Sequence, residues 1–124
     1  MKILVAEDEP TMRRIIELRL KKDGHHVTMA ADGREAMEHI AKNEPFDLII
    51  TDIMMPFSSG LEIVSKVKSN VEKKTPVIVL SSMGQENIVL EAFNLGAYDY
   101  ITKPFSPNEL SMRVKRLAVA IYTT

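Results

Sequence analysis

The sequence predicts an α/β fold in which helices cover both faces of a single parallel sheet. Short, continuously apolar runs alternate with amphipathic segments along the chain, and strands buried on both faces of a parallel sheet typically show such runs. The alternation is strict, with five expected strands and five expected helices joined by short connections. A chain of this kind places its parallel strands between two helical layers and joins them by right-handed crossovers.

Composition limits the class of protein further. The chain has 124 residues, of which 45% are hydrophobic, with a net charge of −1 and no cysteine. This length suits one domain, so we expect residues 1–124 to form a single domain. The balanced charge gives no reason to expect direct contact with nucleic acid, and the lack of cysteine excludes disulfides, a thiolate zinc site and a catalytic thiol.

The N-terminal sequence does not suggest export. "MKILVAEDEP" has a single lysine and a short apolar run broken by acids, so it does not resemble a signal peptide. The longest apolar run is far below the roughly 18 residues that a membrane span requires. We therefore expect a cytoplasmic location and no contact with a membrane.

The first half of the chain predicts two strands and two helices. "KILVA" (2–6) and "HVTMA" (26–30) are the expected strands. Pro10 begins a helix that ends near Gly24, where glycine is a common stop signal. Its apolar residues are expected to share one face: Met12, Ile15, Ile16, Leu18 and Leu20. Asp32 is the expected N-cap of a helix over residues 33–43.

The second half repeats the pattern three times. The expected strands are "LIIT" (48–51), "PVIVLS" (76–81) and "AYDYI" (97–101). Ser59 or Gly60 precedes a helix over residues 61–70, and a second helix over residues 85–96 ends at Gly96. Ser106 as N-cap, Pro107 in the first turn and Glu109 at the third position begin the last helix, over residues 106–122.

Chemically active side chains follow four of the five expected strands. In "LIITDIMMP" an apolar strand leads into Asp52, and a buried carboxylate without a partner is costly. Ligands of open parallel sheets bind beyond the carboxyl ends of the strands, where Asp52 is expected to lie. The polar residues at these ends are Glu7, Asp8, Asp52, Ser81, Ser82, Thr102 and Lys103.

This set of side chains suits a cation and a phosphate. Three neighbouring carboxylates raise one another's pKa values, and a hard divalent cation such as Mg²⁺, for which Mn²⁺ can substitute, relieves that repulsion. Lys103 supplies a positive charge and Ser81 one hydrogen-bond donor. Phosphoryl transfer depends mainly on positioning and charge neutralisation. Asp52 is the expected acceptor, because carboxylates form aspartyl-phosphates.

The motifs "ILVAEDEP", "DLIITDIMMP", "PVIVLSS" and "GAYDYITKPF", in this order, resemble the receiver domain of two-component response regulators. The resemblance covers essentially the whole chain. It implies a flavodoxin-like (βα)5 three-layer sandwich with strand order 2-1-3-4-5. It also implies a signalling switch rather than a classical enzyme, one that catalyses only its own phosphorylation and dephosphorylation. Asp52 would then receive its phosphoryl group from a sensor histidine kinase or a phosphotransfer protein.

The resemblance also implies a role for each site residue. Asp8 and Asp52 would ligate Mg²⁺ together with the backbone carbonyl of Met54, and Glu7 would bind it through water. Lys103 would contact the phosphoryl group or Asp52, Ser81 would move to bond the phosphoryl group, and Tyr100 would turn inward on activation. The sequence departs from the family at one ligand, because Glu7 stands where aspartate is most common.

The output surface is expected to be formed by the fourth helix, the fifth strand and the fifth helix. "GAYDYITKPFSPNEL" together with "RVKRL" resembles receivers that form homodimers through acid–base pairs on this face, for which Asp99, Arg113 and Arg116 are the candidates. The helix over residues 85–96 has no basic residue, so part of that charge pattern is missing. A C-terminal output domain is the other expected target of the switch.

Two alternatives follow from the same residues. A receiver-like binding module that switches without phosphate usually lacks one of the acids, the hydroxyl or the lysine, and all of them are present here. A nucleotide-binding enzyme would need the motif G-x-x-x-x-G-K-[ST] after a strand, but "AEDEP" follows the first strand. The histidines His25, His26 and His39 lack the spacing of a metal site, and the adjacent pair would point to opposite faces of a strand.

Overall fold

A computed structural model describes residues 1–70 and 74–122. Within these residues, five parallel strands form one sheet in the order β2-β1-β3-β4-β5. The strands are β1 (Lys2–Ala6), β2 (His26–Ala30), β3 (Leu48–Asp52), β4 (Val77–Ser82) and β5 (Asp99–Lys103). The flavodoxin-like fold and its strand order, expected from the sequence, are therefore confirmed.

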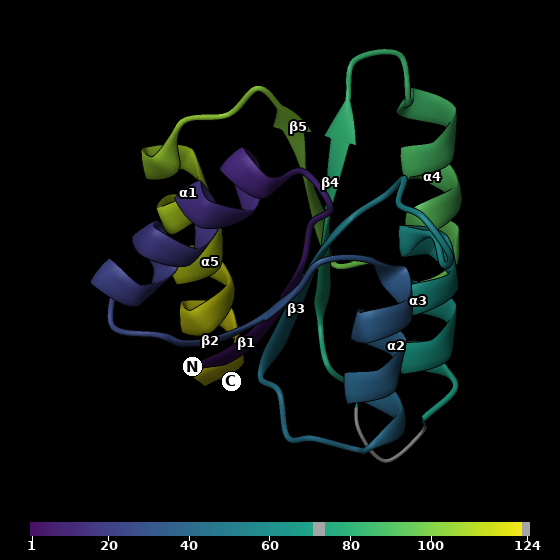
Figure 1. Ribbon diagram of the computed structural model, residues 1–124, viewed down its shortest axis with the longest axis horizontal. Coiled ribbons are helices and arrows are strands. Elements are labelled where there is room, and N and C mark those ends of the chain that lie inside the picture. The colour runs from purple at the N-terminus through teal and green to yellow at the C-terminus, as the bar shows by residue number, and fades with distance from the viewer. Residues whose placement is uncertain (71–73, 123–124) are drawn as a thin grey trace.

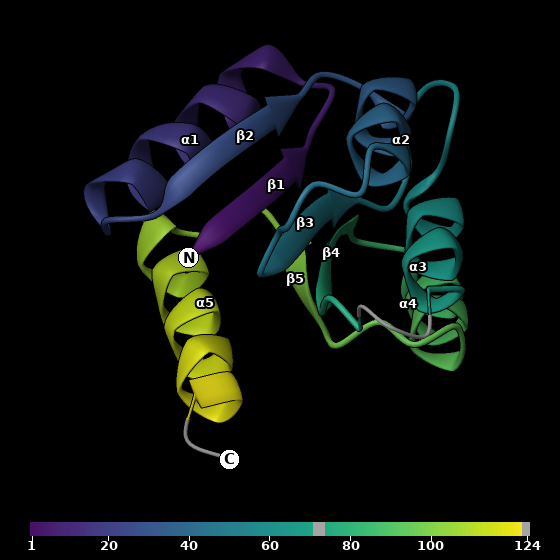
Figure 2. The same cartoon turned by 90° about the horizontal axis from the view of Figure 1, so that it is seen from below.

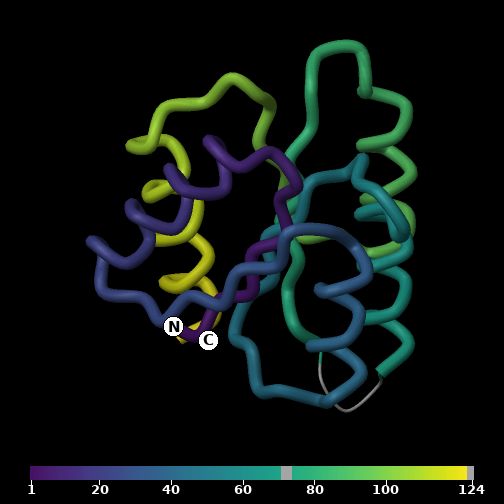
Figure 3. Tube along the Cα trace, in the orientation of Figure 1, coloured from purple at the N-terminus to yellow at the C-terminus, as the bar shows by residue number. Residues whose placement is uncertain are grey.

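The five helices of the described part of the chain cover the sheet in two layers. Figures 1 and 2 show that α1 and α5 lie on one face and α2, α3 and α4 on the other. Their bounds are α1 (Pro10–Lys22), α2 (Gly33–Ala41), α3 (Gly60–Lys68), α4 (Glu86–Asn94) and α5 (Pro107–Tyr122). The loops that follow β4 and β5 both lie at the top of the view in Figure 3. No helix in the described part of the chain is long and apolar enough to cross a membrane.

Each face of the sheet has its own apolar core. Successive residues of a strand point to opposite faces, so in β1 Ile3 and Val5 pack toward α1 and α5, whereas Leu4 and Ala6 pack toward α2 and α3. The largest side chains that are fully buried are Ile3, Leu4, Ile16, Leu20, Leu48, Ile50, Ile53, Ile63, Ile78, Leu80, Ile101 and Leu110. The inner strands β1, β3 and β4 are therefore packed on both faces, and this packing positions the residues at their carboxyl ends.

The predicted N-caps of three helices are confirmed. Asp32 Oδ1 accepts a hydrogen bond from Glu35 N at 2.9 Å, and Ser106 Oγ accepts one from Glu109 N at 3.1 Å. Of the two predicted starts of α3, Ser59 is the N-cap, with its hydroxyl 3.3 Å from Glu62 N. These caps satisfy amide groups that the helix itself leaves without partners.

Two sequence predictions were wrong in detail. Ile15 and Leu18 of α1 are 40% and 52% exposed, because only the narrow stripe that includes Ile16 and Leu20 faces the sheet. The fifth strand begins at Asp99 instead of residue 97, since Ala97 N donates to Ala92 O at 2.9 Å and belongs to the turn after α4. The strand also ends later than expected, at Lys103, which is paired in register with Ser82 of β4.

Candidate functional site

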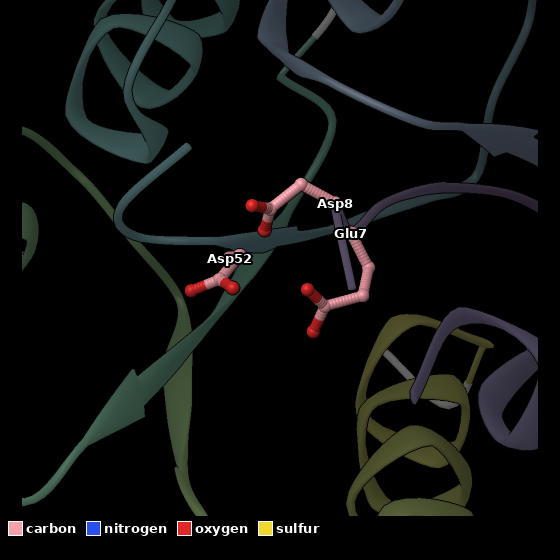
Figure 4. Close-up of side chains that lie close together, drawn as sticks. All are labelled: Glu7, Asp8 and Asp52. Carbon is pink, nitrogen blue, oxygen red and sulfur yellow. The ribbon is translucent and has the colours of Figure 1, made fainter. Parts of the chain in front are cut away.

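The acidic residues predicted to meet at the sheet edge do meet there. Asp52 is the last residue of β3 and is 8% exposed, whereas Glu7, directly after β1, is fully buried. Carboxylate oxygens of Glu7, Asp8 and Asp52 lie within 4.8 Å of one another. Figure 4 shows the three carboxyl groups turned toward a common space.

Lys103 crosses from β5 to this cluster and contacts two of its carboxylates. Its Nζ lies 2.7 Å from Asp52 Oδ2 and 2.6 Å from Glu7 Oε1. The contact with Asp52 is a hydrogen bond. The contact with Glu7 lacks hydrogen-bond alignment, and Glu7 Oε1 has no other hydrogen-bond partner among the described residues. One ammonium group therefore contacts two buried carboxylates and can balance the charge of only one of them.

Burial and neighbouring charges together set the pKa values of Glu7 and Lys103. Burial raises the pKa of Glu7 to about 7; the contact with Lys103 opposes this shift and the charge of Asp52 adds to it. Burial alone would lower the pKa of Lys103, but its contacts with Asp52 and Glu7 outweigh that effect and leave its pKa above the ordinary value. Lys103 therefore stays charged at neutral pH, whereas Glu7 loses its proton as the pH rises through its pKa of about 7.

The loop between β1 and α1 is fixed by a residue that the sequence analysis did not identify. Arg13 Nη1 donates to the carbonyl oxygens of Glu7 at 3.0 Å and of Asp8 at 3.4 Å. The Glu9 amide donates to Glu7 Oε2 at 3.2 Å. No sequence pattern separates Arg13 from Arg14, whose side chain instead forms an exposed ion pair with Glu17.

The predicted switch residues lie on the side of Asp52 nearest α4. Ser81 in β4 is 2% exposed, and Tyr100 in β5 is 39% exposed with its ring edge-to-face on Phe93 at 5.8 Å. Both residues line a groove of about 430 Å³ between β4, β5 and α4, together with Met83 and Leu90. The Tyr100 ring therefore lies at the surface, and the groove provides room for it to change position.

Met54 lies two residues beyond Asp52, in the loop that follows β3. Its amide is 3.5 Å from Asp52 Oδ1, and its side chain is 54% exposed. The loop that carries it returns to the strand at Gly60, whose amide donates to the Ile53 carbonyl at 2.9 Å. A Cβ at Gly60 would lie 2.6 Å from the Asp52 carbonyl oxygen. Glycine at this position therefore allows α3 to begin directly against the end of β3.

The three residues of the predicted dimer face form one cluster within the monomer. Arg113 Nη1 lies 3.0 Å from both carboxylate oxygens of Asp99, and Arg116 Nη2 lies 2.9 Å from Asp99 Oδ2. Asp99 is 9% exposed, whereas the side chain of Arg116 is 64% exposed. Any intermolecular pairing of Asp99 would have to compete with these contacts.

The donor set fits a hard divalent cation. Three carboxylates that converge from two strand ends offer the oxygen ligands that Mg²⁺ prefers, and a single ammonium group leaves the cluster with excess negative charge. Within residues 1–70 and 74–122, this is the one group of three or more acidic, histidine or cysteine side chains close enough to share an ion. His25 instead contacts the N-terminal amine, and His39 pairs with Glu44.

The chain is thus an α/β domain whose open parallel sheet carries acids, a hydroxyl and a lysine at its carboxyl edge, where sheets of this kind bind ligands. Comparison with known proteins gives the family. The protein-family model of the response regulator receiver domain matches residues 3–115 of this sequence. The transcriptional regulatory protein SrrA of Staphylococcus aureus is 37% identical over 115 residues, which cover 93% of this chain and 46% of SrrA.

Solved structures agree with this assignment. A putative response regulator from Chloroflexus aurantiacus superposes with a TM-score of 0.84 at 35% identity, over 93% of this chain and 94% of the other. The chemotaxis response regulator CheY4 of Vibrio cholerae gives 0.84 at 34% identity, over 93% and 96%. The chain therefore belongs to the response regulator receiver domain family. It spans about half the length of the curated relatives that it matches.

Proposed function

We propose that Asp52 accepts a phosphoryl group from the phosphohistidine of a sensor histidine kinase or a phosphotransfer protein. The observation that carries this proposal is the position of Asp52: a strand-end carboxylate held by Lys103 at 2.7 Å beside two further acids. Receiver domains are signalling domains of two-component systems rather than classical enzymes. Dephosphorylation of Asp52 by the domain itself is part of the proposal.

The chain's own groups would divide the work of the transfer. Lys103 holds Asp52 Oδ2, which leaves Oδ1 to form the bond to phosphorus as the phosphorus–nitrogen bond of the donor histidine breaks and its electron pair returns to the imidazole. A divalent cation, Mg²⁺ or Mn²⁺, held by Asp8, Asp52 and the Met54 carbonyl, with Glu7 bound through water, would neutralise the phosphoryl oxygens. Ser81 would donate its hydroxyl hydrogen to one of those oxygens.

Phosphorylation would then change the surface formed by α4, β5 and α5. Movement of Ser81 and Lys103 toward the new charge would open space beneath the Tyr100 ring, which now lies against Phe93. The added charge only shifts the balance between conformations that already exist. We propose that residues 1–124 act as one receiver domain in the cytoplasm, without direct contact with nucleic acid or membrane. The surface would control a C-terminal output domain or another partner.

Replacing the acceptor tests the proposal. Incubation with acetyl phosphate and Mg²⁺ should add one phosphoryl group to each wild-type chain, and Asp52→Asn should remove this modification completely because an amide oxygen is a poor nucleophile. Intact-mass spectrometry measures the product. Asp47→Asn is the matched control, since Asp47 caps the Lys2 amide at the opposite end of the sheet. A phosphorylated Asp52→Asn chain would refute the assignment of the acceptor.

Magnesium should stabilise the folded protein. A cation that binds only the folded state adds RT ln(1 + [Mg²⁺]/Kd), which is about 2.7 kcal/mol at a hundredfold excess over Kd. The melting temperature should therefore rise with Mg²⁺ concentration in the wild-type protein and much less in Asp8→Asn. Differential scanning fluorimetry measures both. Equal responses of the two proteins would remove Asp8 from the ligand set.

A phosphorylation-dependent homodimer is the proposed response of the α5 surface. Arg113→Glu should abolish such a dimer, because the reversed charge would repel Asp99 of its own chain and of a second copy. Sedimentation velocity with beryllofluoride and Mg²⁺ measures the association, and Lys115→Glu on the same helix is the control. A dimer unaffected by Arg113→Glu would exclude this acid–base cluster from the interface.

The alternative, a receiver-like binding module that switches without phosphate, is not favoured. Such a module has no need for the acceptor, the two further acids, the hydroxyl and the lysine together, and all five groups lie at one edge of this sheet. Activation that persisted fully in Asp52→Asn would favour it again.

A further inference from the structure

The side chain of Gln85 folds back onto the end of β4. The Ser82 amide donates to Gln85 Oε1 at 2.6 Å, and the Gln85 amide donates to the Ser82 carbonyl at 3.3 Å. Gly84, at φ +88°, makes the left-handed turn that this return requires, which a residue with a Cβ adopts only at a cost. Gln85 thus closes the β4–α4 loop directly beside Ser81.

The Ser82 amide faces the acceptor side of β4. Ile53 N donates to the Leu80 carbonyl at 2.9 Å, so the backbone polar groups of Leu80 point toward β3. These groups alternate between the two neighbours along an inner parallel strand, so Ser82, two residues on, points the same way. β3 ends at Asp52, the register partner of Leu80. The Ser82 amide therefore points into the space beyond Asp52.

The first turn of α4 has no side-chain cap. The other four helices of the described chain have an N-cap side chain that accepts hydrogen bonds from first-turn amides: Glu9, Asp32, Ser59 and Ser106. Gln85 occupies the N-cap position of α4 but makes no such bond. The carboxamide oxygen of Gln85 is therefore bonded to the end of β4 and not to the first turn of α4.

We propose that Gln85 Oε1 is a placeholder for a phosphoryl oxygen. In the unphosphorylated protein Gln85 Oε1 accepts the hydrogen bond of the Ser82 amide. In the phosphorylated protein a phosphoryl oxygen on Asp52 accepts that hydrogen bond and displaces Gln85 Oε1. A charged oxygen accepts a stronger hydrogen bond than a carboxamide oxygen does, so the exchange is favourable once the phosphoryl group is attached. The released carboxamide frees the β4–α4 loop and the start of α4. This inference rests on the proposed phosphorylation of Asp52.

Gln85 would therefore be a positioning residue that opposes occupancy of the site. Each phosphoryl group must first break the Ser82–Gln85 bond, and removing that requirement should strengthen binding. The net contribution of one neutral hydrogen bond corresponds to an affinity change of about three- to tenfold. Gln85→Ala should thus bind beryllofluoride, a phosphoryl mimic, about three- to tenfold more tightly in the presence of Mg²⁺.

Two variants separate this role from a merely structural one. Gln85→Glu retains the acceptor and adds a negative charge that opposes the mimic, so its affinity for beryllofluoride should fall below that of the wild type. Asn87→Ala, at an exposed position in the first turn of α4, should leave the affinity unchanged. The Ser82 amide proton provides a direct readout by NMR: it should shift upfield in Gln85→Ala and return downfield when beryllofluoride binds.

The outcomes are distinct. Equal or weaker binding of beryllofluoride by folded Gln85→Ala, or tighter binding by Gln85→Glu, would overturn the placeholder role while leaving the proposed function intact. A wild-type protein that bound no beryllofluoride at saturating Mg²⁺ would overturn the proposed function, and this inference with it. Melting temperatures of all four proteins establish that each affinity refers to a folded chain.

Discussion

Lys103→Met should destabilise the metal-free protein by about 3 kcal/mol at pH 8, because removing one partner of a buried ion pair leaves an uncompensated charge. Lys103 contacts both Glu7 and Asp52, which are fully buried and 8% exposed. Methionine fills a similar volume but supplies no charge. Urea denaturation in the presence of a chelator measures the change in the free energy of unfolding.

The size of the loss should depend on pH and on Mg²⁺. Protonation of Glu7 removes one of the two charges that Lys103 contacts, so the loss should shrink below the Glu7 pKa of about 7. Mg²⁺ should restore more stability to Lys103→Met than to the wild type, because a cation replaces the missing ammonium group. The control is Lys115→Met at an exposed position of α5. Losses that were equal in the two variants and independent of pH would contradict this account of Lys103.

The fold was predictable because the apolar runs, the amphipathic segments and the helix caps all indicated the same strands and helices. Apolar runs on β1, β3 and β4 alternate with amphipathic helices, and the caps Asp32, Ser59 and Ser106 mark where three helices begin. The convergence of Glu7, Asp8, Asp52 and Lys103 followed from a geometric rule, since the carboxyl ends of parallel strands share one edge. The strand order itself came from resemblance to a family.

Properties that depend on packing between distant segments were not predictable. The sequence suggested that Lys103 contacts a phosphoryl group or Asp52, but not that it also contacts Glu7 and so bridges the two carboxylates. Arg13 donates hydrogen bonds to the backbone carbonyls of Glu7 and Asp8. No pattern of residues in the sequence predicts these contacts. The exposure of Ile15 and Leu18 likewise depends on which stripe of α1 meets the sheet.

The buried carboxyl of Glu7 should make the metal-free protein less stable as pH rises from 4.5 to about 7. Below pH 4.5 Glu7 is protonated in both the folded and the unfolded chain. Between the ordinary pKa of 4.5 and the folded-state value of about 7, only the folded chain keeps the proton, so the free energy of unfolding falls. Above that window both states are ionised, and the loss is complete at about 3 kcal/mol.

Comparison with Glu7→Gln isolates this contribution, because every other titrating group is common to both proteins. The free energy of unfolding of the wild type, minus that of Glu7→Gln, should decrease by about 3 kcal/mol across the window in urea titrations with a chelator present. Glu38→Gln, at an exposed position of α2, should show no such change. Saturating Mg²⁺ should weaken or reverse the slope, since the cation binds the ionised carboxylates and competes with the proton. A difference that stayed constant with pH would mean that Glu7 is already ionised in the metal-free fold and that Lys103 stabilises both carboxylates without help from a proton.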